Sequence, residues 1–192
     1  MNSSISLFLP LFLTISINLF AQEKFESERS IKRSEVPTNA LLFIDSLKTE
    51  TRIKWYEEEG LTKKSFEAKF KLNRVKYSVE FDTLGIIEDV EMEFDWLELS
   101  DSTARLIKAQ MNDACVKHKI RKVQKQFIGS EHDLFNLLRQ NIWSDSIDVN
   151  YEIVVKCKNQ SETNLFEYLF TDEGELLNKS KIVFKNSSHL EY

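Results

Sequence analysis

One run of the sequence places an acidic residue at every second position: Asp89, Glu91, Glu93 and Asp95. Carboxylate oxygens are ligands that Ca²⁺ prefers, so these side chains could bind a cation. Calcium sites, however, usually take their ligands from a bent loop, whereas alternate residues of a strand lie along one flat face. We therefore interpret the run as the solvated face of a strand, which also discourages edge-to-edge pairing, and predict no metal site.

The three histidines, His118, His132 and His189, do not indicate a metal or catalytic site, because none lies at helical or strand spacing from another. We expect His118 to end a helix, where a cation suits the helix dipole, and His132 to lie in the first turn of a short helix. His189 falls in the tail. No serine lies in a Gly-x-Ser-x-Gly motif, and no cysteine–histidine pair has a local signature, so we predict no catalytic residue.

The sequence also offers no loop for a phosphate or dinucleotide cofactor. Its four glycines are Gly60, Gly85, Gly129 and Gly174, and each stands alone between apolar-patterned segments. A turn at such a place needs a residue that tolerates positive φ, which leaves no glycine for a phosphate-binding loop. We predict no cofactor.

The N-terminus carries an apolar run at residues 5–20, and the first charged residue is Glu23. Such a run has the length of a signal-peptide core and is short for a membrane span. Ala21 is a small residue suited to precede a cut, so we predict a signal peptide at residues 1–21 and a soluble periplasmic or secreted product. Because no Lys or Arg precedes the run, an uncleaved anchor and a buried core segment stay as alternatives.

Cys115 and Cys157 are the only cysteines, and an exported protein permits a disulfide between them. We expect Cys157 on the strand face that looks towards the helix carrying Cys115. Two buried thiols are the other interpretation, because free cysteine packs well in cores. The sequence leaves both open.

Composition excludes some classes of function. Hydrophobic residues make up 42% of the 192 residues and aromatic residues 11%, which suffices for packed cores. The net charge is −5, and neither half is basic: residues 1–96 carry 13 basic and 17 acidic side chains, and the remainder 13 and 14. The basic surface of a nucleic-acid binder is missing, so we predict no nucleic-acid partner.

Hydrophobic periodicity predicts an α+β fold in which a helix precedes a meander of four antiparallel strands. After a polar, flexible lead-in at residues 22–35, an amphipathic helix is expected at 38–48, begun by Val36-Pro37. The period then changes to two, with strands around Trp55 and at 66–72, 77–81 and 90–94. One face of these strands is apolar and the other charged, as in a sheet covered on one side by a helix.

The same order recurs in the second half of the chain. A helix follows Ser100, its predicted N-cap, and strands are expected at 120–127, 151–157, 166–170 and 175–184. Residues 66–71 align with 151–156, and 77–85 align with 166–174 without a gap, so that Gly85 matches Gly174. We interpret this as a tandem repeat, with unit 1 at residues 36–96, unit 2 at 97–185 and a tail at 186–192.

At these residues the chain resembles the PepSY-like domains of exported bacterial proteins, which are grouped with the β-lactamase-inhibitor-like fold. The resemblance rests on Val36-Pro37, Ile53-Lys54-Trp55, the aromatic-rich hairpin, the turns ending at Gly85 and Gly174, and the segments 121–129 and 151–155. It implies a periplasmic or secreted location and a binding or inhibitory role, and it supplies no catalytic residues. Arg74 stands where a glycine is usual, with Val75 after it, and these departures concern only the geometry of that turn.

Unit 2 has a helical insertion at about residues 130–143, in which Leu134, Leu137 and Leu138 form an apolar stripe. Val154 and Leu169 also place apolar side chains on the face that is charged in unit 1. We predict that the insertion helix covers this face. An interface between the units, or a site for a partner, is the alternative.

Our leading hypothesis is a non-enzymatic binding module that grips a protein or peptide by a sheet surface. A small-ligand carrier with a pocket between two sheets and an envelope hydrolase with a dispersed site are the alternatives. A cleft holding perturbed carboxylates would favour the hydrolase, a closed apolar cavity the carrier, and an open concave sheet the binding module.

Overall fold

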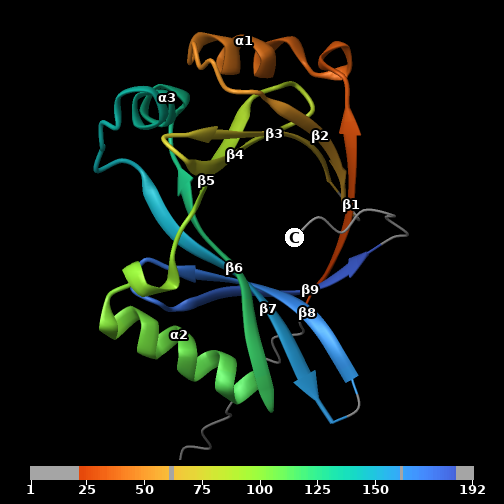
Figure 1. Ribbon diagram of the computed structural model, residues 1–192, viewed down its shortest axis with the longest axis vertical. Helices are drawn as coiled ribbons and strands as arrows, with labels where there is room; N and C mark the ends of the chain where they lie inside the picture. The colour runs from red at the N-terminus through yellow and green to blue at the C-terminus, as the bar shows by residue number, and fades with distance from the viewer. Residues whose placement is uncertain (1–21, 61–62, 161, 185–192) are drawn as a thin grey trace, which may run out of the picture.

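The computed structural model describes residues 22–60, 63–160 and 162–184 (Figure 1). The predicted signal peptide and the predicted tail lie outside the described residues. Within the described residues, no helix is long and apolar enough to cross a membrane.

Three α-helices, two 3₁₀ helices and nine strands form over these residues. In chain order they are β1 (Gln22–Ile31), η1 (Arg33–Glu35), α1 (Thr38–Ser46), β2 (Lys54–Glu59), β3 (Lys64–Leu72), β4 (Val75–Phe81), β5 (Ile87–Glu93), η2 (Trp96–Glu98), α2 (Asp101–Ala114), β6 (Lys117–Ile128), α3 (Glu131–Gln140), β7 (Asp148–Asn159), β8 (Glu162–Thr171) and β9 (Leu176–Phe184). The predicted α+β class is confirmed. Ser100 caps α2 as predicted, because its side chain accepts a hydrogen bond from the Thr103 amide at 3.1 Å.

All nine strands join in one closed sheet. Successive strands pair antiparallel, and β1 pairs with β9 in parallel to complete the ring seen in Figure 1. The predicted four-stranded sheets therefore continue into each other, since β5 pairs with β6 where Val90 lies opposite Phe127. Residues 22–35 differ from the predicted flexible lead-in, because they contain η1 and the strand β1 that closes the sheet. Backbone pairing orders this polar segment without any apolar periodicity.

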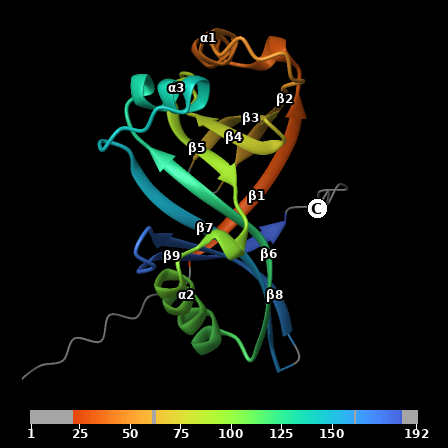
Figure 2. The same cartoon turned by 60° about the vertical axis from the view of Figure 1, so that its left-hand side comes forward.

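The helices all lie outside the ring of strands. Figure 1 shows α1 and α3 beside β2–β5 and α2 beside β6–β9, and the turned view in Figure 2 agrees. One face of every strand is thus directed outward, and the other is directed into the ring. Each group of helices covers one buried apolar cluster between itself and the outward face.

The first apolar cluster contains Trp55 and Phe81, as the sequence predicts. Phe81 is fully buried, and its ring lies 5.8 Å from that of Phe43 on α1 and 6.1 Å from that of Trp55. The second cluster places Ile107 and Met111 of α2 against outward-facing residues of β6–β8. The fold therefore has two apolar cores, and both lie outside the closed sheet.

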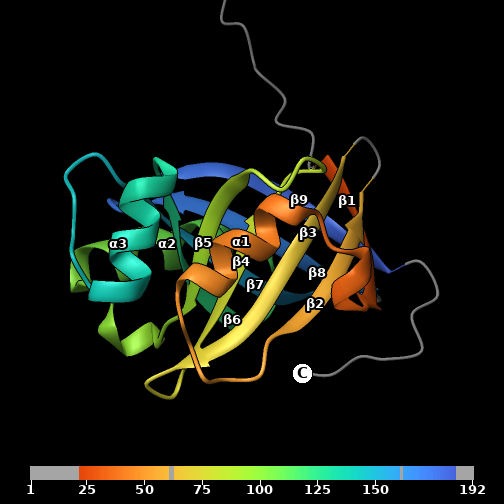
Figure 3. The same cartoon turned by 90° about the horizontal axis from the view of Figure 1, so that it is seen from above.

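Helix α3 does not cover the second half of the sheet, so the predicted position of the insertion is wrong. Leu134 and Leu138 join the first cluster instead, and the Phe135 ring lies 6.2 Å from Phe43. Figure 3 shows α3 beside α1. Arg139 donates hydrogen bonds to the carbonyls of Ser46 and Leu47, at 3.0 and 3.3 Å. These hydrogen bonds satisfy carbonyls at the end of α1. The apolar stripe of α3 therefore packs beside α1, in the first half of the sheet.

Val154 is nevertheless buried without the insertion helix. It alternates with Ile153 and Val155, which belong to the cluster under α2, so its side chain is directed into the ring. The closed sheet itself covers this position, because the inward faces of both halves look towards each other. That arrangement corresponds to the alternative in which the two halves of the chain share an interface.

The turns after β4 and β8 are built alike. The Gly85 amide donates to the Asp82 carbonyl and the Gly174 amide to the Thr171 carbonyl, each at 3.0 Å. Gly85 has a φ of 78°, and a Cβ there would lie 2.7 Å from the Ala40 amide nitrogen of α1. Glycine is required at this position both for the left-handed backbone and for the close approach of the helix.

A disulfide joins Cys115 to Cys157, with their Cα atoms 5.5 Å apart. Cys115 is the C-cap of α2, so the bond ties the end of this helix to β7. Asn159 supports the same junction, because its side-chain amide donates to the Ala114 carbonyl and its oxygen accepts from the Val116 amide.

Candidate functional site

Polar side chains cover much of the inward face of the closed sheet. The buried polar residues on strands β3 to β9 are Ser65, Glu67, Ser78, Asp89, Glu91, Gln124, Glu152 and Ser180. Asp89 is 9% exposed and Glu91 5% exposed, so the predicted solvated face is wrong for both. Closure of the sheet turns this face inward, which the periodicity of one strand cannot reveal.

Amide groups of β6 hold the two buried carboxylates of β5. Gln124 Nε2 donates to Glu91 Oε2 at 2.8 Å, and Gln126 Nε2 donates to Asp89 Oδ2 at 2.9 Å. Asn150 Nδ2 on β7 in turn donates to Gln126 Oε1 at 3.2 Å. Two buried oxygens of this network, Asp89 Oδ1 and Gln124 Oε1, accept no hydrogen bond in the described part of the chain.

Carboxylates gather across the first four strands after β1. Glu58, Glu67 and Glu80 each offer an oxygen within 4.8 Å of the others, and so do Glu80, Asp89 and Glu91. Glu80 links the two groups because it lies opposite Glu67 on one side and Asp89 on the other. Together they form a continuous acidic row on the inward face.

Burial and mutual repulsion shift the acid–base behaviour of this row. Burial, with the nearby charge of Glu91, raises the pKa of Asp89 to about 7. Burial and the charge of Glu67 likewise raise the pKa of Glu58 well above its usual range. Burial alone would also raise the pKa of Glu67, but the Lys69 ammonium, 2.8 Å from its Oε2, lowers that pKa overall.

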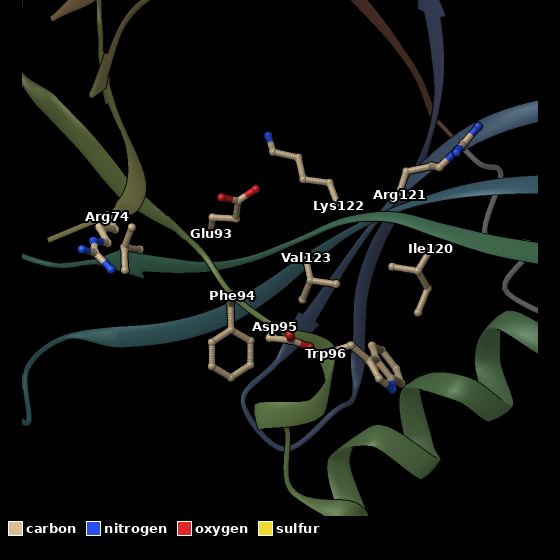
Figure 4. Close-up of a pocket in the computed structure, with 10 residues that line it drawn as sticks. Arg74, Glu93, Phe94, Asp95, Trp96, Ile120, Arg121, Lys122 and Val123 are labelled. Atoms are coloured by element: carbon tan, nitrogen blue, oxygen red, sulfur yellow. The ribbon is translucent and has the colours of Figure 1, made fainter. Parts of the chain in front are cut away.

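A cleft of about 460 Å³ opens beside this row, where β5 ends and β6 bulges (Figure 4). Ile120 pairs with Val155 and Lys122 with Val154, so Arg121 is the extra residue of the bulge. The lining residues are Arg74, Val75, Glu93, Phe94, Asp95, Trp96, Ile120, Arg121, Lys122 and Val123. In Figure 4, Lys122 and Glu93 point to one side, and Phe94 and Trp96 point towards α2.

The aromatic side of the cleft is held in place by packing and by a helix cap. The Phe94 ring packs against Tyr151, with centroids 5.8 Å apart, and the Lys125 ammonium lies 4.1 Å from the Phe94 centroid. The Asp95 side chain accepts a hydrogen bond from the Leu97 amide at 2.9 Å and so starts η2, which carries Trp96. These contacts present a firm apolar surface to the cleft.

The two carboxylates that line the cleft already have partners, whereas its two guanidinium groups have none among the described residues. Glu93 pairs with Lys76 at 3.0 Å, and Asp95 caps η2. Within the described residues, the guanidinium groups of Arg74 and Arg121 make no hydrogen bond or ion pair. Arg74 has a φ of 73°, a conformation that a residue with a Cβ rarely adopts.

Lys122 connects the cleft with the acidic row. Burial would lower the pKa of Lys122, but Glu91 and Glu152 outweigh burial and raise this pKa. The ammonium therefore stays charged between the open cleft and the buried carboxylates.

The residues singled out in the sequence do not come together in one site. His118 lies in β6 rather than at the end of α2, which stops at Ala114. His132 lies in the first turn of α3, where its Nε2 is 3.0 Å from Asn136 Nδ2, and His189 is outside the described residues. Of the four alternating acids, Asp89 and Glu91 are buried inside the ring, and Glu93 and Asp95 line the cleft, where Asp95 also caps η2. The sequence contains no signal for the cleft itself, whose basic residues come from a turn and a bulge.

Comparison with known proteins shows a related fold but no family. No family model matches the chain, and no curated protein matches it. A DUF2874 family protein from Bacteroides uniformis has a similar structure, with a TM-score of 0.52 and 12% identity over 76% of this chain and 89% of that chain. A DUF2874 family protein from Bacteroides ovatus has a TM-score of 0.50 and 13% identity over 76% of this chain and 88% of that chain. A BLIP-like protein from Bacteroides fragilis has 17% identity over 81% of this chain and 93% of that chain. Its TM-score of 0.46 is too low to show a common fold.

Proposed function

We propose that this protein is a non-enzymatic binding module of the cell envelope, and that it holds an acidic peptide segment of a partner protein in the cleft. The observation that carries the proposal is that Arg74 and Arg121, whose guanidinium groups have no partner among the described residues, line the same cleft as the aromatic side chains Phe94 and Trp96. Arginine matches a carboxylate with two parallel hydrogen bonds, and aromatic residues supply the apolar contact area typical of protein interfaces.

The two alternatives have less support. A small-ligand carrier needs a closed apolar cavity, and the inward face of this sheet is charged and amide-rich. A hydrolase needs its perturbed carboxylates to reach a substrate. Asp89 and Glu91 are buried and are not among the residues that line the cleft, so the cleft supports binding rather than acid–base chemistry.

Selection of displayed random peptides tests the proposal. We expect the wild-type protein to enrich peptides that combine acidic and aromatic or aliphatic residues. The variant Arg74→Glu/Arg121→Glu should lose them, because each reversed charge repels the peptide carboxylates. Arg52→Glu/Lys117→Glu is the matched control, since it makes the same charge change at exposed positions outside the cleft. Equal binding of the selected peptides to both variants, with both folded by circular dichroism, would contradict the proposal.

The proposed location is the periplasm or the cell exterior. The apolar run at residues 5–20 supports it, and so does the disulfide, because such bonds persist in oxidising compartments. We expect the intact mass of protein purified from the native envelope to correspond to a chain that begins at Gln22. A retained Met1 would contradict export with cleavage.

We also propose that the chain arose by tandem duplication of one helix-and-meander unit of the PepSY-like type. Two coincidences support this beyond the sequence alignment. The bulge between Glu80 and Phe81 matches the bulge between Leu169 and Phe170, at aligned positions. The turns that follow share their hydrogen bonds and their left-handed glycine, at Gly85 and Gly174.

A further inference from the structure

We propose that the inward face of the sheet binds a divalent cation of the calcium class, held by the carboxylates of Glu80, Asp89 and Glu91 with the side-chain oxygen of Gln124 beside them. The site is separate from the peptide cleft and does not depend on it. The proposal reverses the sequence-based expectation of no metal, because that expectation rested on a solvated, flat strand face.

The spacing of the oxygens fits calcium. Glu80 lies opposite Asp89 in the β4–β5 ladder, and Glu91 is the next inward-facing residue of β5. One oxygen from each of the three residues lies within 4.8 Å of the other two. Oxygens this close can converge on one ion after small side-chain movements, and calcium, with ligand distances of about 2.3–2.6 Å, requires a smaller movement than Mg²⁺, at about 2.0–2.1 Å.

The backbone at this point is bent, unlike the flat strand on which the objection to a calcium site rested. The register between β4 and β5 shifts between Glu80 and Phe81, and such a bulge turns a strand and re-aims its side chains. The proposed ligands come from three neighbouring strands of a closed sheet, because Glu80 of β4 and Gln124 of β6 join Asp89 and Glu91, which are alternate residues of β5.

Two unsatisfied oxygens point independently to a missing ligand. Asp89 Oδ1 and Gln124 Oε1 accept no hydrogen bond in the described residues. Both side chains are buried, with Asp89 9% exposed and Gln124 4% exposed, so water does not readily reach them. A buried acceptor without a partner is energetically unfavourable, so native structures rarely keep one. Asp89 belongs to the group of three carboxylates, and Gln124 is hydrogen-bonded to Glu91 of the same group, so both oxygens lie at the proposed site. Carboxylate and amide oxygens are both calcium ligands.

Neighbouring amides already hold the carboxylates as second-sphere groups do in metal sites. Gln126 Nε2 binds Asp89 Oδ2, and Gln124 Nε2 binds Glu91 Oε2, at 2.9 and 2.8 Å. Each bond occupies one carboxylate oxygen and fixes the direction of the other.

The charges around the site favour a cation. Glu58 of β2 and Glu67 of β3 extend the acidic row, and Glu152 of β7 adds another carboxylate on the far side. Lys69 is occupied by Glu67 and Glu28, at 2.8 and 3.0 Å. Lys122 is near enough to feel Glu91, but among the described residues it forms no ion pair within 4 Å.

Calcium titration of the full chain, after chelation with EDTA, tests the proposal. We expect CaCl₂ to bind with a stoichiometry of one ion per chain by calorimetry and to raise the melting temperature, because an ion that binds only the folded chain stabilises it. MgCl₂ at the same concentration should shift the melting temperature less. Terbium, a luminescent calcium substitute, should give a signal that calcium displaces.

The variant Asp89→Asn/Glu91→Gln should lose the calcium-induced shift, while Glu59→Gln/Glu93→Gln should retain it. The control removes the same charge from exposed carboxylates of the same sheet. Gln126→Ala, which leaves every proposed ligand in place, should weaken binding on the order of 10–100-fold. Absence of any calcium effect on the wild-type protein up to millimolar concentration would overturn the proposal. Equal calcium binding by the wild-type protein and a folded Asp89→Asn/Glu91→Gln variant would also overturn it. If that variant does not fold, the calcium titration of the wild-type protein alone tests the proposal.

Discussion

Replacing Phe81 by alanine is expected to lower the free energy of unfolding by about 3–5 kcal/mol. The side chain is 0% exposed and lies in the middle of the first apolar cluster, in ring contact with Phe43 of α1 and Trp55 of β2. Its removal leaves a cavity between the sheet and α1, because close-packed neighbours relax only in part. The effect therefore combines lost burial with lost packing.

Urea denaturation followed by circular dichroism measures this loss. Leu42→Ala is the control, since Leu42 lies on the same helix as Phe43 but is 62% exposed, and we expect it to change stability by less than about 1 kcal/mol. If Phe81→Ala costs no more than Leu42→Ala, the outward face of β4 has been misassigned.

Changing Asp89 to asparagine is expected to stabilise the calcium-free protein at neutral pH and to have little effect near pH 4. The pKa of Asp89 is about 7 in the folded protein, against an ordinary value of 3.8. Between these two pH values the folded chain holds a proton that the unfolded chain has released. Stability therefore falls as the pH rises through this window, and it levels off above pH 7.

The magnitude follows from the size of the shift. Each pKa unit corresponds to about 1.4 kcal/mol, so the wild-type protein should lose up to about 4 kcal/mol across the window through this group. Glu67 acts in the opposite direction. Because folding lowers its pKa, Glu67 stabilises the folded chain above pH 4.5, the ordinary pKa of this group, and this stabilisation is lost as the pH falls. The trend of Glu67 overlaps that of Asp89 mainly near pH 4. Glu58, whose pKa is also raised, acts in the same direction as Asp89, so the contribution of Asp89 is the difference between the wild-type and Asp89→Asn curves between pH 5 and 7.

Denaturant unfolding between pH 4 and 8, with EDTA present, measures this dependence. The Asp89→Asn variant keeps an oxygen that can accept from Gln126 Nε2, so the hydrogen bond to β6 is preserved. Its stability should depend less on pH than that of the wild-type protein. Glu93→Gln, at an exposed position on the same strand, should follow the wild-type curve. Parallel curves for Asp89→Asn and wild type would show that Asp89 does not titrate in this window.

Local patterns in the sequence determined the elements of this protein. Ser100 and Ser130 begin helices as predicted, because a serine side chain before a helix accepts a hydrogen bond from a backbone amide that lacks a partner. Alternation of apolar residues predicted β2–β9 and placed Trp55 and Phe81 beneath α1. Each of these features depends on residues a few positions apart, so its signal lies within a short window of sequence.

Only the tertiary structure decided how the elements combine. Strand β1 carries no apolar alternation, so the sequence did not predict it. It is held by backbone hydrogen bonds to β2 and β9, and these leave no signature in side-chain type. The stripe Leu134, Leu137 and Leu138 predicted that α3 would pack, but the surface it covers depends on distant residues of α1. Closure of the sheet by β1 also turned Asp89 and Glu91 inward. Whether an acidic strand face meets water or other carboxylates is thus determined by strand pairing across the whole chain, and that pairing built the candidate cation site.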